Sequence, residues 1–585
     1  MINLTIDRVK VEVEPGTTVL EAARQHGIRI PTLCYLKEIN QIGACRMCLV
    51  EVKGYRGLQT ACTMPCAEGM DVATHTRDVR DTRKLILELL LSDHNISCPS
   101  CVRQGNCELL RLSQEAGITD LPIQGEHHAA HIDRSSPSIV LDGSKCVLCQ
   151  RCVAVCRDVQ GVSAIGLVNR GFESRVAPFF EAQVNTAACT TCGQCTLVCP
   201  TGACTERDDT ARVWDAIHDP TKHVIVQTAP AIRVAVGETF GLAPGAITTG
   251  QMVTGLRRLG FDKVFDTTFT ADLTIIEEAS ELVARLTHGG PLPLITSCSP
   301  GWVKFAEHFY PKMLDHLSTC KSPQQMFGAL AKTFYAQKYG IDPKDIVSVS
   351  IMPCTAKKFE ADRPEMNASG YRDVDFVLTT REFGRMLRQA GVNLGKLPET
   401  EFDSPLGLST GAGVIFGTTG GVMEAALRTA AEWLTGDHLN ARIKFTEVRG
   451  EVRGIREATI VIGGNVLRVA VANGLAAASK LLEKIEAGEA EYHFVEMMGC
   501  PGGCIGGGGQ PIPADGPEDL DEVRQARIQS LYTIDELSTL RRSHENPAVQ
   551  ALYREFLGKP LGEMSHHLLH THYHVRHPAG VRSKR

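Results

Sequence analysis

Residues 145–156 read KCVLCQRCVAVC, and residues 188–204 read ACTTCGQCTLVCPTGAC. Four cysteines in each stretch follow the spacing Cys-x2-Cys-x2-Cys-x3-Cys, so the two stretches form an internal repeat. This spacing is typical of domains with two four-iron clusters, in which the fourth cysteine of each unit ligates the cluster of the other unit. Residues 137–209 are therefore predicted to hold two 4Fe-4S clusters, one on Cys146, Cys149, Cys152 and Cys199, the other on Cys189, Cys192, Cys195 and Cys156.

The whole chain of 585 residues is unusually rich in cysteine, with 22 in total. The first 204 residues carry 17 of them, which indicates a metal-binding N-terminal third, because structural disulfides are disfavoured in a reducing compartment. The net charge is −6, whereas a domain that binds nucleic acid is usually basic. No apolar run reaches the ~18 residues of a membrane span, and the charged start does not resemble a signal peptide. We expect a cytoplasmic protein that binds neither nucleic acid nor membrane.

Residues 1–78 are predicted to form a β-grasp domain of the 2Fe-2S ferredoxin type. Residues 2–13 alternate apolar and polar side chains, as in a β-hairpin, and a capping box at Thr18–Glu21 starts a helix. Two irons bridged by sulfide need four thiolates, and four cysteines follow that helix. The alternative is a tetrahedral zinc site on the same side chains. The predicted ligands are Cys34, Cys45, Cys48 and Cys62.

Residues 79–118 begin as a helix and then become rich in cysteine. The spacing His94-x3-Cys98-x2-Cys101-x5-Cys107 gives three thiolates and leaves one position of a four-iron cluster for another ligand. His94 precedes Cys98 by one helical turn and is the predicted fourth ligand; the alternative is a histidine at the surface or at the helix end. One 2Fe-2S and three 4Fe-4S clusters, with no substrate motif among them, would form an electron wire.

Residues 220–520 show a different pattern, in which short apolar runs alternate with helical stretches. This alternation predicts a large α/β domain with parallel sheets, followed by a helical segment at 521–585. Three of the apolar runs end at cysteines, namely at Cys298, at Cys354, and at the pair Cys500 and Cys504. Since ligands gather beyond the carboxyl ends of strands in open α/β sheets, these thiols could converge on one buried site. Chance placement of core cysteines is the alternative.

The segments around these cysteines read TSCSPGW (296–302), MPCTAKKFE (352–360) and EMMGCPGGCIGGGGQ (496–510). At these motifs the chain resembles the iron-only (FeFe) hydrogenases, over nearly all of residues 1–573. It is most similar to the hydrogenase subunit of multi-subunit, NADP-reducing enzymes of sulfate reducers. The resemblance implies an enzyme that reversibly splits H2 into protons and electrons. Its H-cluster would join a four-iron cube through a cysteine to a two-iron unit carrying CO, cyanide and azadithiolate.

The resemblance also assigns residues in the catalytic pocket. It makes Cys354, Cys500 and Cys504 ligands of the cube, with Cys504 also bridging to the two-iron unit. It places Lys357 and Met352 beside the cyanide and CO ligands. The other pocket residues are Pro230, Gln324 and Met498.

One position departs from the family pattern. The family has two adjacent cysteines in the first motif, a proton relay followed by a cube ligand, whereas this chain has Cys298-Ser299. An alcohol is hardly ionised at neutral pH and is a poor partner for soft iron. Either Cys298 ligates the cube and the relay is altered, or Cys298 relays protons and the fourth ligand is unusual.

The other members of the proton relay match the family by position. They are Glu278, Glu281 and Ser318, with Arg285 at the surface end. Glu278 and Glu281 are three residues apart and so share one face of a helix. The alternative for the two glutamates is a solvated acidic face.

Two other functions compete with hydrogenase. A non-catalytic relative that assembles iron–sulfur clusters would tend to lose the relay, and a subunit of a respiratory dehydrogenase would lack the three motifs. The chain offers no nucleotide site of its own, because Gly411–Gly417 misses the GxGxxG spacing. We therefore expect H2 and protons as substrates, and a hetero-oligomer with a flavin- and NADP-binding subunit and a small 2Fe-2S subunit.

Overall fold

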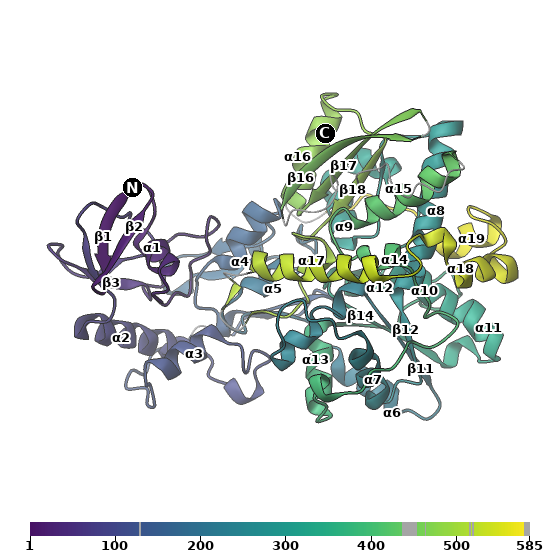
Figure 1. The fold of residues 1–585 in the computed structure, drawn as a ribbon. Helices are drawn as coiled ribbons and strands as arrows, with labels where there is room; N and C mark the ends of the chain where they lie inside the picture. Colours follow the sequence, from purple (N-terminus) through teal and green to yellow (C-terminus); the bar gives the residue numbers. More distant parts are fainter. Residues whose placement is uncertain (128–129, 436–452, 463, 514–515, 518–519, 578–585) are drawn as a thin grey trace.

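The computed structural model describes residues 1–585 except 128–129, 436–452, 463, 514–515, 518–519 and 578–585. The last eight residues of the predicted helical segment 521–585 therefore lie outside the described residues. Figure 1 shows the N-terminal part, in purple, to one side of a large teal and green body. Among the described residues, no helix is long and apolar enough to cross a membrane.

A five-stranded sheet in the order β2-β1-β5-β3-β4 opens the chain. The predicted hairpin is present, with Leu4 paired to Val11 and a tight turn at Asp7 and Arg8. Thr18 caps the following helix through the backbone N–H of Glu21, but the Glu21 carboxylate does not complete a capping box, because it accepts from Tyr35 and Arg24 instead. The elements are β1 (Ile2–Ile6), β2 (Val9–Val13), α1 (Val19–Gln25), β3 (Leu49–Val52), β4 (Gln59–Thr60) and β5 (Asp71–Ala73).

The next part of the chain consists of short elements joined by cysteine-bearing loops. Its long helix α2 ends at His94, and the following loop is tied to the repeat region by a hydrogen bond from Asn95 N to Ser144 O. The elements are α2 (Arg77–Asp93), α3 (Glu108–Glu115), β6 (Ile132–Asp133), β7 (Ile139–Asp142), α4 (Arg151–Ala154), β8 (Gly166–Val168), β9 (Arg175–Ala177), α5 (Gln194–Val198) and β10 (Cys204–Glu206).

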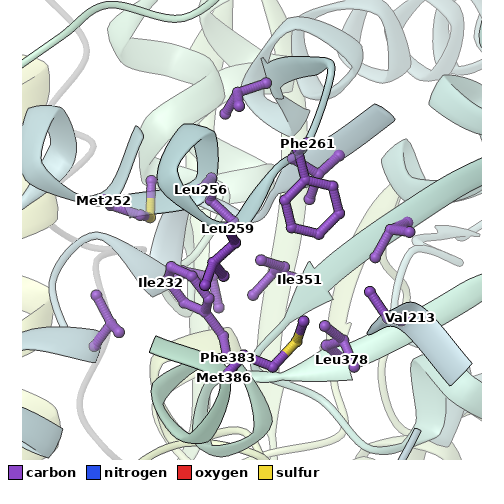
Figure 2. Packing of buried hydrophobic residues seen from close by; sticks show 14 of the residues in the cluster. Val213, Ile232, Met252, Leu256, Leu259, Phe261, Ile351, Leu378, Phe383 and Met386 are labelled. Carbon is purple, nitrogen blue, oxygen red and sulfur yellow. The ribbon is translucent and has the colours of Figure 1, made fainter. Parts of the chain in front are cut away.

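The large body contains two four-stranded sheets. The first has the order β12-β11-β14-β15, and all its neighbouring pairs are parallel, as predicted. Figure 2 shows the core that packs on this sheet, with Met252, Leu256, Phe261, Ile351 and Phe383 among its side chains. The elements of this half are α6 (Thr210–His218), β11 (His223–Thr228), α7 (Thr249–Leu259), β12 (Lys263–Asp266), β14 (Ile346–Met352), α12 (Ala356–Ala361), β15 (Phe376–Thr379) and α13 (Thr380–Gln389).

The second sheet has the order β13-β18-β17-β16 and is mixed. Its first three strands are parallel, but β16 pairs with β17 antiparallel, from Gly454↔Asn473 to Ile462↔Asn465. This hairpin of β16 and β17 at the edge of the sheet was not predicted. The elements around this sheet are α8 (Thr267–His288), β13 (Leu294–Ile295), α9 (Pro300–Phe309), α14 (Gly411–Ile415), α15 (Gly421–Thr435), β16 (Gly454–Ile462), β17 (Asn465–Asn473), α16 (Leu475–Glu486) and β18 (Phe494–Met498), whereas α10 (Pro323–Leu330) and α11 (Ala336–Tyr339) pack on the first sheet.

The described part of the C-terminal segment contains three α-helices as far as residue 569, of which α17 (Leu520–Leu537) packs on α14 and α18 (Pro547–Leu552) on α8. The third helix is α19 (Glu563–Leu569), and all three are drawn in yellow tones in Figure 1. The fully buried Glu277 of α8 joins them to the body. Its carboxylate accepts from the hydroxyls of Tyr553 and Ser565 and from Leu561 N, and it pairs with His570 at 3.1 Å.

Glu277→Ala is expected to loosen this segment. The change leaves the hydroxyls of Tyr553 and Ser565 buried without their acceptor, so the local free energy of opening should fall by about 3 kcal/mol. Amide hydrogen exchange in residues 553–569 measures the change, with the exposed Glu486→Ala as control. Exchange at the native rate in Glu277→Ala would show that packing alone holds the segment.

Candidate active site and cluster chain

The strand ends of the two sheets bring the cysteines of the three motifs together. Cys354 follows β14, and Cys500 and Cys504 follow β18. Burial raises the pKa of the Cys500 thiol, and the charges of Cys354 and then Cys504 raise it further. Burial also raises the pKa of Cys504 to about 12, with Cys354 as the largest charged neighbour. Such a set of buried soft donors needs a cation to stabilise its thiolates, and iron supplies one.

Glycines allow the loop after β18 to pass between two neighbouring segments. A Cβ on Gly503, which has φ +88°, would lie 2.6 Å from Thr419 N. A Cβ on Gly508 would lie 2.4 Å from the carbonyl oxygen of Cys192. The backbone therefore approaches both segments more closely than any side chain would permit.

Cys298 lies on another side of this group of thiols. Burial raises its pKa well above the usual value, and Glu278 and then Cys504 are the next causes. Its carbonyl oxygen accepts a hydrogen bond of 3.1 Å from Lys357 Nζ. Lys357 also pairs with the buried Glu360 at 3.0 Å. The backbone of the TSCSPGW motif is thus hydrogen-bonded to the ammonium group of Lys357 in the MPCTAKKFE motif.

The remaining pocket residues are buried at the same strand ends. Met352 and Met498 close β14 and β18 and are each 2% exposed. Pro230 is buried after β11, where a Cβ on Gly417 would lie 3.4 Å from its Cγ. Gln324 donates to Glu360 at 3.1 Å, while its own Oε1 is buried without a hydrogen-bond partner among the described residues. That orphaned oxygen marks a polar position that a pocket ligand or water would satisfy.

The predicted relay residues form a continuous row from the pocket toward the surface. Burial raises the pKa of Glu278 to about 8, with Glu281 as the second cause, and Glu278 Oε2 has no hydrogen-bond partner in the part of the chain that the structure describes. Ser318 interacts with Glu278 and donates to Glu281 Oε2 at 3.1 Å. Glu281 in turn pairs with Arg285 at 2.6 Å. The two glutamates are buried, so the alternative of a solvated acidic face is wrong.

The eight cysteines of the repeat line two cavities. One cavity is bordered by Cys146, Cys149, Cys152 and Cys199, together with Cys204, and the other by Cys156, Cys189, Cys192 and Cys195. The structure thus groups the fourth cysteine of each unit with the first three of the other unit. The two groupings are the two sets derived from the sequence spacing.

The first two sites are also assembled. Cys48 and Cys62 have their sulfurs 3.3 Å apart, and Cys34 and Cys45 form a second hydrogen-bonded pair, which lowers the pKa of Cys34 to about 7. His94 is half-buried, and its Nδ1 has no hydrogen-bond partner among the residues that the structure describes. Burial, and then Lys145, lower the pKa of His94, so the imidazole is neutral at pH 7, the form that binds metal.

Cys98, Cys101 and Cys107 follow His94 on the loop between α2 and α3. Cys101 and Cys107 lie close enough for their charges to interact. Cys101 also meets the repeat region, because a Cβ on Gly202 would lie 2.8 Å from its sulfur. The third set of thiols is therefore next to the first cavity of the repeat.

The second cavity of the repeat adjoins the catalytic thiols. Cys500 is among the charged neighbours that raise the pKa of Cys192, after burial and Cys195. Thr355, next to Cys354, donates to Thr191 O at 2.7 Å, and Gln194 donates to Gly506 O at 2.8 Å. These bonds hold the two groups of thiols against each other across sequence separations of more than 150 residues.

Sequence reasoning missed two buried glutamates of this site. Glu360 stands three residues after Lys357 in MPCTAKKFE, and this one-turn spacing is the signal that could have identified the ion pair. Glu496 is a charged residue inside the apolar strand β18. Its carboxylate accepts from Gly420 N and Met423 N, and so it holds the start of α15 against the catalytic loop.

Comparison with known proteins finds the same kinds of domain in the same order along the chain. Residues 222–508 match the family described as "Iron only hydrogenase large subunit, C-terminal domain", and residues 521–576 match "Iron hydrogenase small subunit". Three more regions match cluster-binding families. They are "2Fe-2S iron-sulfur cluster binding domain" at 1–77, "NADH-ubiquinone oxidoreductase-G iron-sulfur binding region" at 83–122 and "4Fe-4S dicluster domain" at 145–203.

Individual relatives match over almost the whole chain. The NADP-reducing hydrogenase subunit HndD of Solidesulfovibrio fructosivorans is 49% identical, covering 98% of this chain and 99% of the relative. Iron hydrogenase 1 of Clostridium pasteurianum is 42% identical, covering 98% and 100%. Among solved structures, a variant of the FeFe hydrogenase HydA1 from Chlamydomonas reinhardtii matches with a TM-score of 0.56. It is 49% identical and covers 63% of this chain and 99% of its own.

The chain therefore belongs to the iron-only (FeFe) hydrogenases. It is a catalytic subunit that acts on H2, with a 2Fe-2S domain, several 4Fe-4S binding regions and an H-cluster domain. The predicted family and the predicted order of domains are confirmed.

Proposed function

We propose that this subunit oxidises H2 reversibly and passes the electrons along its own clusters to a partner subunit that reduces NADP. The observation that carries the proposal is the pair of hydrogen bonds from Thr355 to Thr191 O and from Gln194 to Gly506 O, because they join the catalytic loops to the repeat. The cluster counts of the proposal are one 2Fe-2S cluster, three 4Fe-4S clusters and the H-cluster. The boundaries given in the sequence analysis are proposed for its five domains.

The pocket residues are proposed to act as follows. Cys354, Cys500 and Cys504 hold the cube, and Lys357, oriented by Glu360, presents its ammonium group to the anionic ligands of the two-iron unit. Met352, Met498 and Pro230 line the apolar side of that unit, and Gln324 its polar side. When bound, the H-cluster supplies the redox chemistry that splits H2.

The protons are proposed to leave through residues of this chain alone. Cys298 exchanges a proton with Glu278, and Ser318 passes it on to Glu281, whose carboxylate faces Arg285 near the surface. Glu278 suits this role because its raised pKa keeps the acid and its anion close in energy near neutral pH.

The NADP part of the proposal rests on the name of the relative HndD and on the packing of the chain's Gly-rich segment. Gly411 and Gly413 belong to the buried helix α14, where a Cβ on Gly413 would lie 2.6 Å from Thr268 O. That segment has no room for a dinucleotide. We propose that flavin and NADP bind on another subunit of a hetero-oligomer that also contains a small 2Fe-2S subunit. A cytoplasmic location fits the 22 free thiols.

The experiment is an anaerobic assay of the matured subunit alone and with its partner subunits. The subunit alone should reduce a viologen dye with H2 but leave NADP+ unchanged, and added partners should restore NADP+ reduction. Reduction of NADP+ by the isolated subunit would contradict the proposed division of labour.

His94→Ala is expected to slow electron transfer to an external acceptor by about tenfold or more, because one four-iron cluster loses a ligand. Hydrogen–deuterium exchange at the active site needs no wire and should survive. The measurement compares viologen reduction with exchange, using as control His75→Ala, whose side chain is 73% exposed. Equal loss of both reactions would show that His94 supports more than the wire.

A further inference from the structure

Cys298 and Ser299 are adjacent, yet their side chains meet different parts of the site. The Cys298 side chain packs against the apolar cluster that includes Phe416 and Met498. The Ser299 hydroxyl instead accepts a hydrogen bond of 3.1 Å from the backbone N–H of Gly499, the residue before Cys500. A Cβ on Gly499 would also lie 3.1 Å from Ser299 Oγ. The hydroxyl of the pair thus faces the loop that carries a cube ligand, whereas the Cys298 side chain packs against a different part of the site.

The hydroxyl of Ser299 does not cap its own helix, although Ser299 stands at the N-cap position. Ser299 is the N-cap of α9, and Pro300 occupies the first turn. A serine at this position usually accepts a backbone N–H of its own helix. In this structure the Ser299 side chain makes no such bond. Its oxygen is turned away from α9 and toward Gly499.

The surroundings of Ser299 also connect it with the electron wire. Gly301, in the first turn of α9, packs against the repeat, because its Cβ position lies 3.6 Å from Cys192 Cβ and from Thr190 O. Ser299 is therefore held between the loop of Cys500 and the loop of Cys192. A cube that exchanges electrons with the repeat would lie between these two loops, and Ser299 is positioned to supply its fourth ligand.

We propose that Ser299 Oγ is the fourth protein ligand of the H-cluster cube, beside Cys354, Cys500 and Cys504, and that Cys298 is free to relay protons. The inference rests on the proposed cube. The iron–oxygen bond forms as the hydroxyl proton is released to solvent, so the oxygen binds as an alkoxide. The Gly499 N–H stabilises this negative oxygen.

The proposal predicts a particular redox behaviour of the cube. An alkoxide is a harder donor than a thiolate and favours ferric over ferrous iron. The Ser299→Cys variant should therefore raise the midpoint potential of the cube. In the matured enzyme the infrared bands of CO and cyanide report on the H-cluster separately from the other clusters.

The deciding experiment uses the full chain made without the maturation enzymes, and its readout is independent of H2 turnover. Mild oxidation of Ser299→Ala should release iron from a cube with three ligands and produce a three-iron electron-resonance signal. Cys298→Ala should resemble the unchanged protein. Should Ser299→Ala fail to fold, the potential shift of matured Ser299→Cys replaces it.

Iron loss in Cys298→Ala, or the same spectrum in all three proteins, would overturn the assignment, and so would a Ser299→Cys potential equal to that of the unchanged protein. Absence of H2 turnover in the matured, unchanged protein, together with the expected three-iron signal in unmatured Ser299→Ala, would instead reject the proposed function and leave the ligand assignment standing.

Discussion

Replacing Glu278 with Gln is expected to lower H2 turnover by about 100-fold or more while every cluster stays in place. Glu278 is buried beside Cys298, and its Oε2 has no partner in the described structure. An amide fills the same space but cannot take up and release a proton. Since Ser318 and Glu281 lie beyond it, the change interrupts the row at its inner end.

The measurement pairs the rate of H2 oxidation with the electron-resonance spectrum of the H-cluster. Glu278→Asp, which keeps a carboxyl group, should retain part of the rate, and Glu277→Gln on the same helix should retain most of it, because Glu277 faces the C-terminal segment. Near-normal turnover of Glu278→Gln with a normal spectrum would show that protons take another route.

The pH dependence of H2 evolution provides a second test of the role of Glu278 in proton transfer. In this direction Glu278 must donate a proton, and only its neutral form can do so. Because burial raises its pKa to about 8, the rate should fall as the pH rises through about 8. A flat profile through this range would indicate that another group limits proton delivery.

Much of the site could be predicted from the sequence because its ligands are close together along the chain. The cysteine spacings that begin at Cys146 and Cys189 are those of 4Fe-4S ligands, and the two cavities group these cysteines as expected. The catalytic thiols were recognisable because each follows an apolar strand. Parallel strands then bring their carboxyl ends to one edge.

The parts that escaped prediction depend on contacts between distant segments. Glu277 meets His570 across 293 residues, and no local pattern distinguishes it from its neighbour Glu278, which faces the pocket. The different surroundings of Cys298 and Ser299 likewise depend on Gly499, about 200 residues away. The hairpin of β16 and β17 was locally visible, because apolar residues alternate on both sides of Gly463–Gly464, and this signal was overlooked.

The second large effect concerns the two-iron unit. The pocket offers three cysteine thiols, sufficient with one further ligand for a cube, and the wire sites offer their own complete sets. Protein made without the maturation enzymes should therefore bind iron and sulfide. It should still be inactive, because the ammonium group of Lys357 and the relay residues catalyse nothing without the unit that they surround.

The most direct test of the account is the rate of viologen reduction by H2, measured on the same protein preparation before and after the two-iron unit is installed. We predict no detectable rate before installation and full activity after it, with the accessory clusters unchanged in their spectra. H2 uptake by the protein that carries only cubes and the 2Fe-2S cluster would contradict the assignment of the chemistry to the H-cluster.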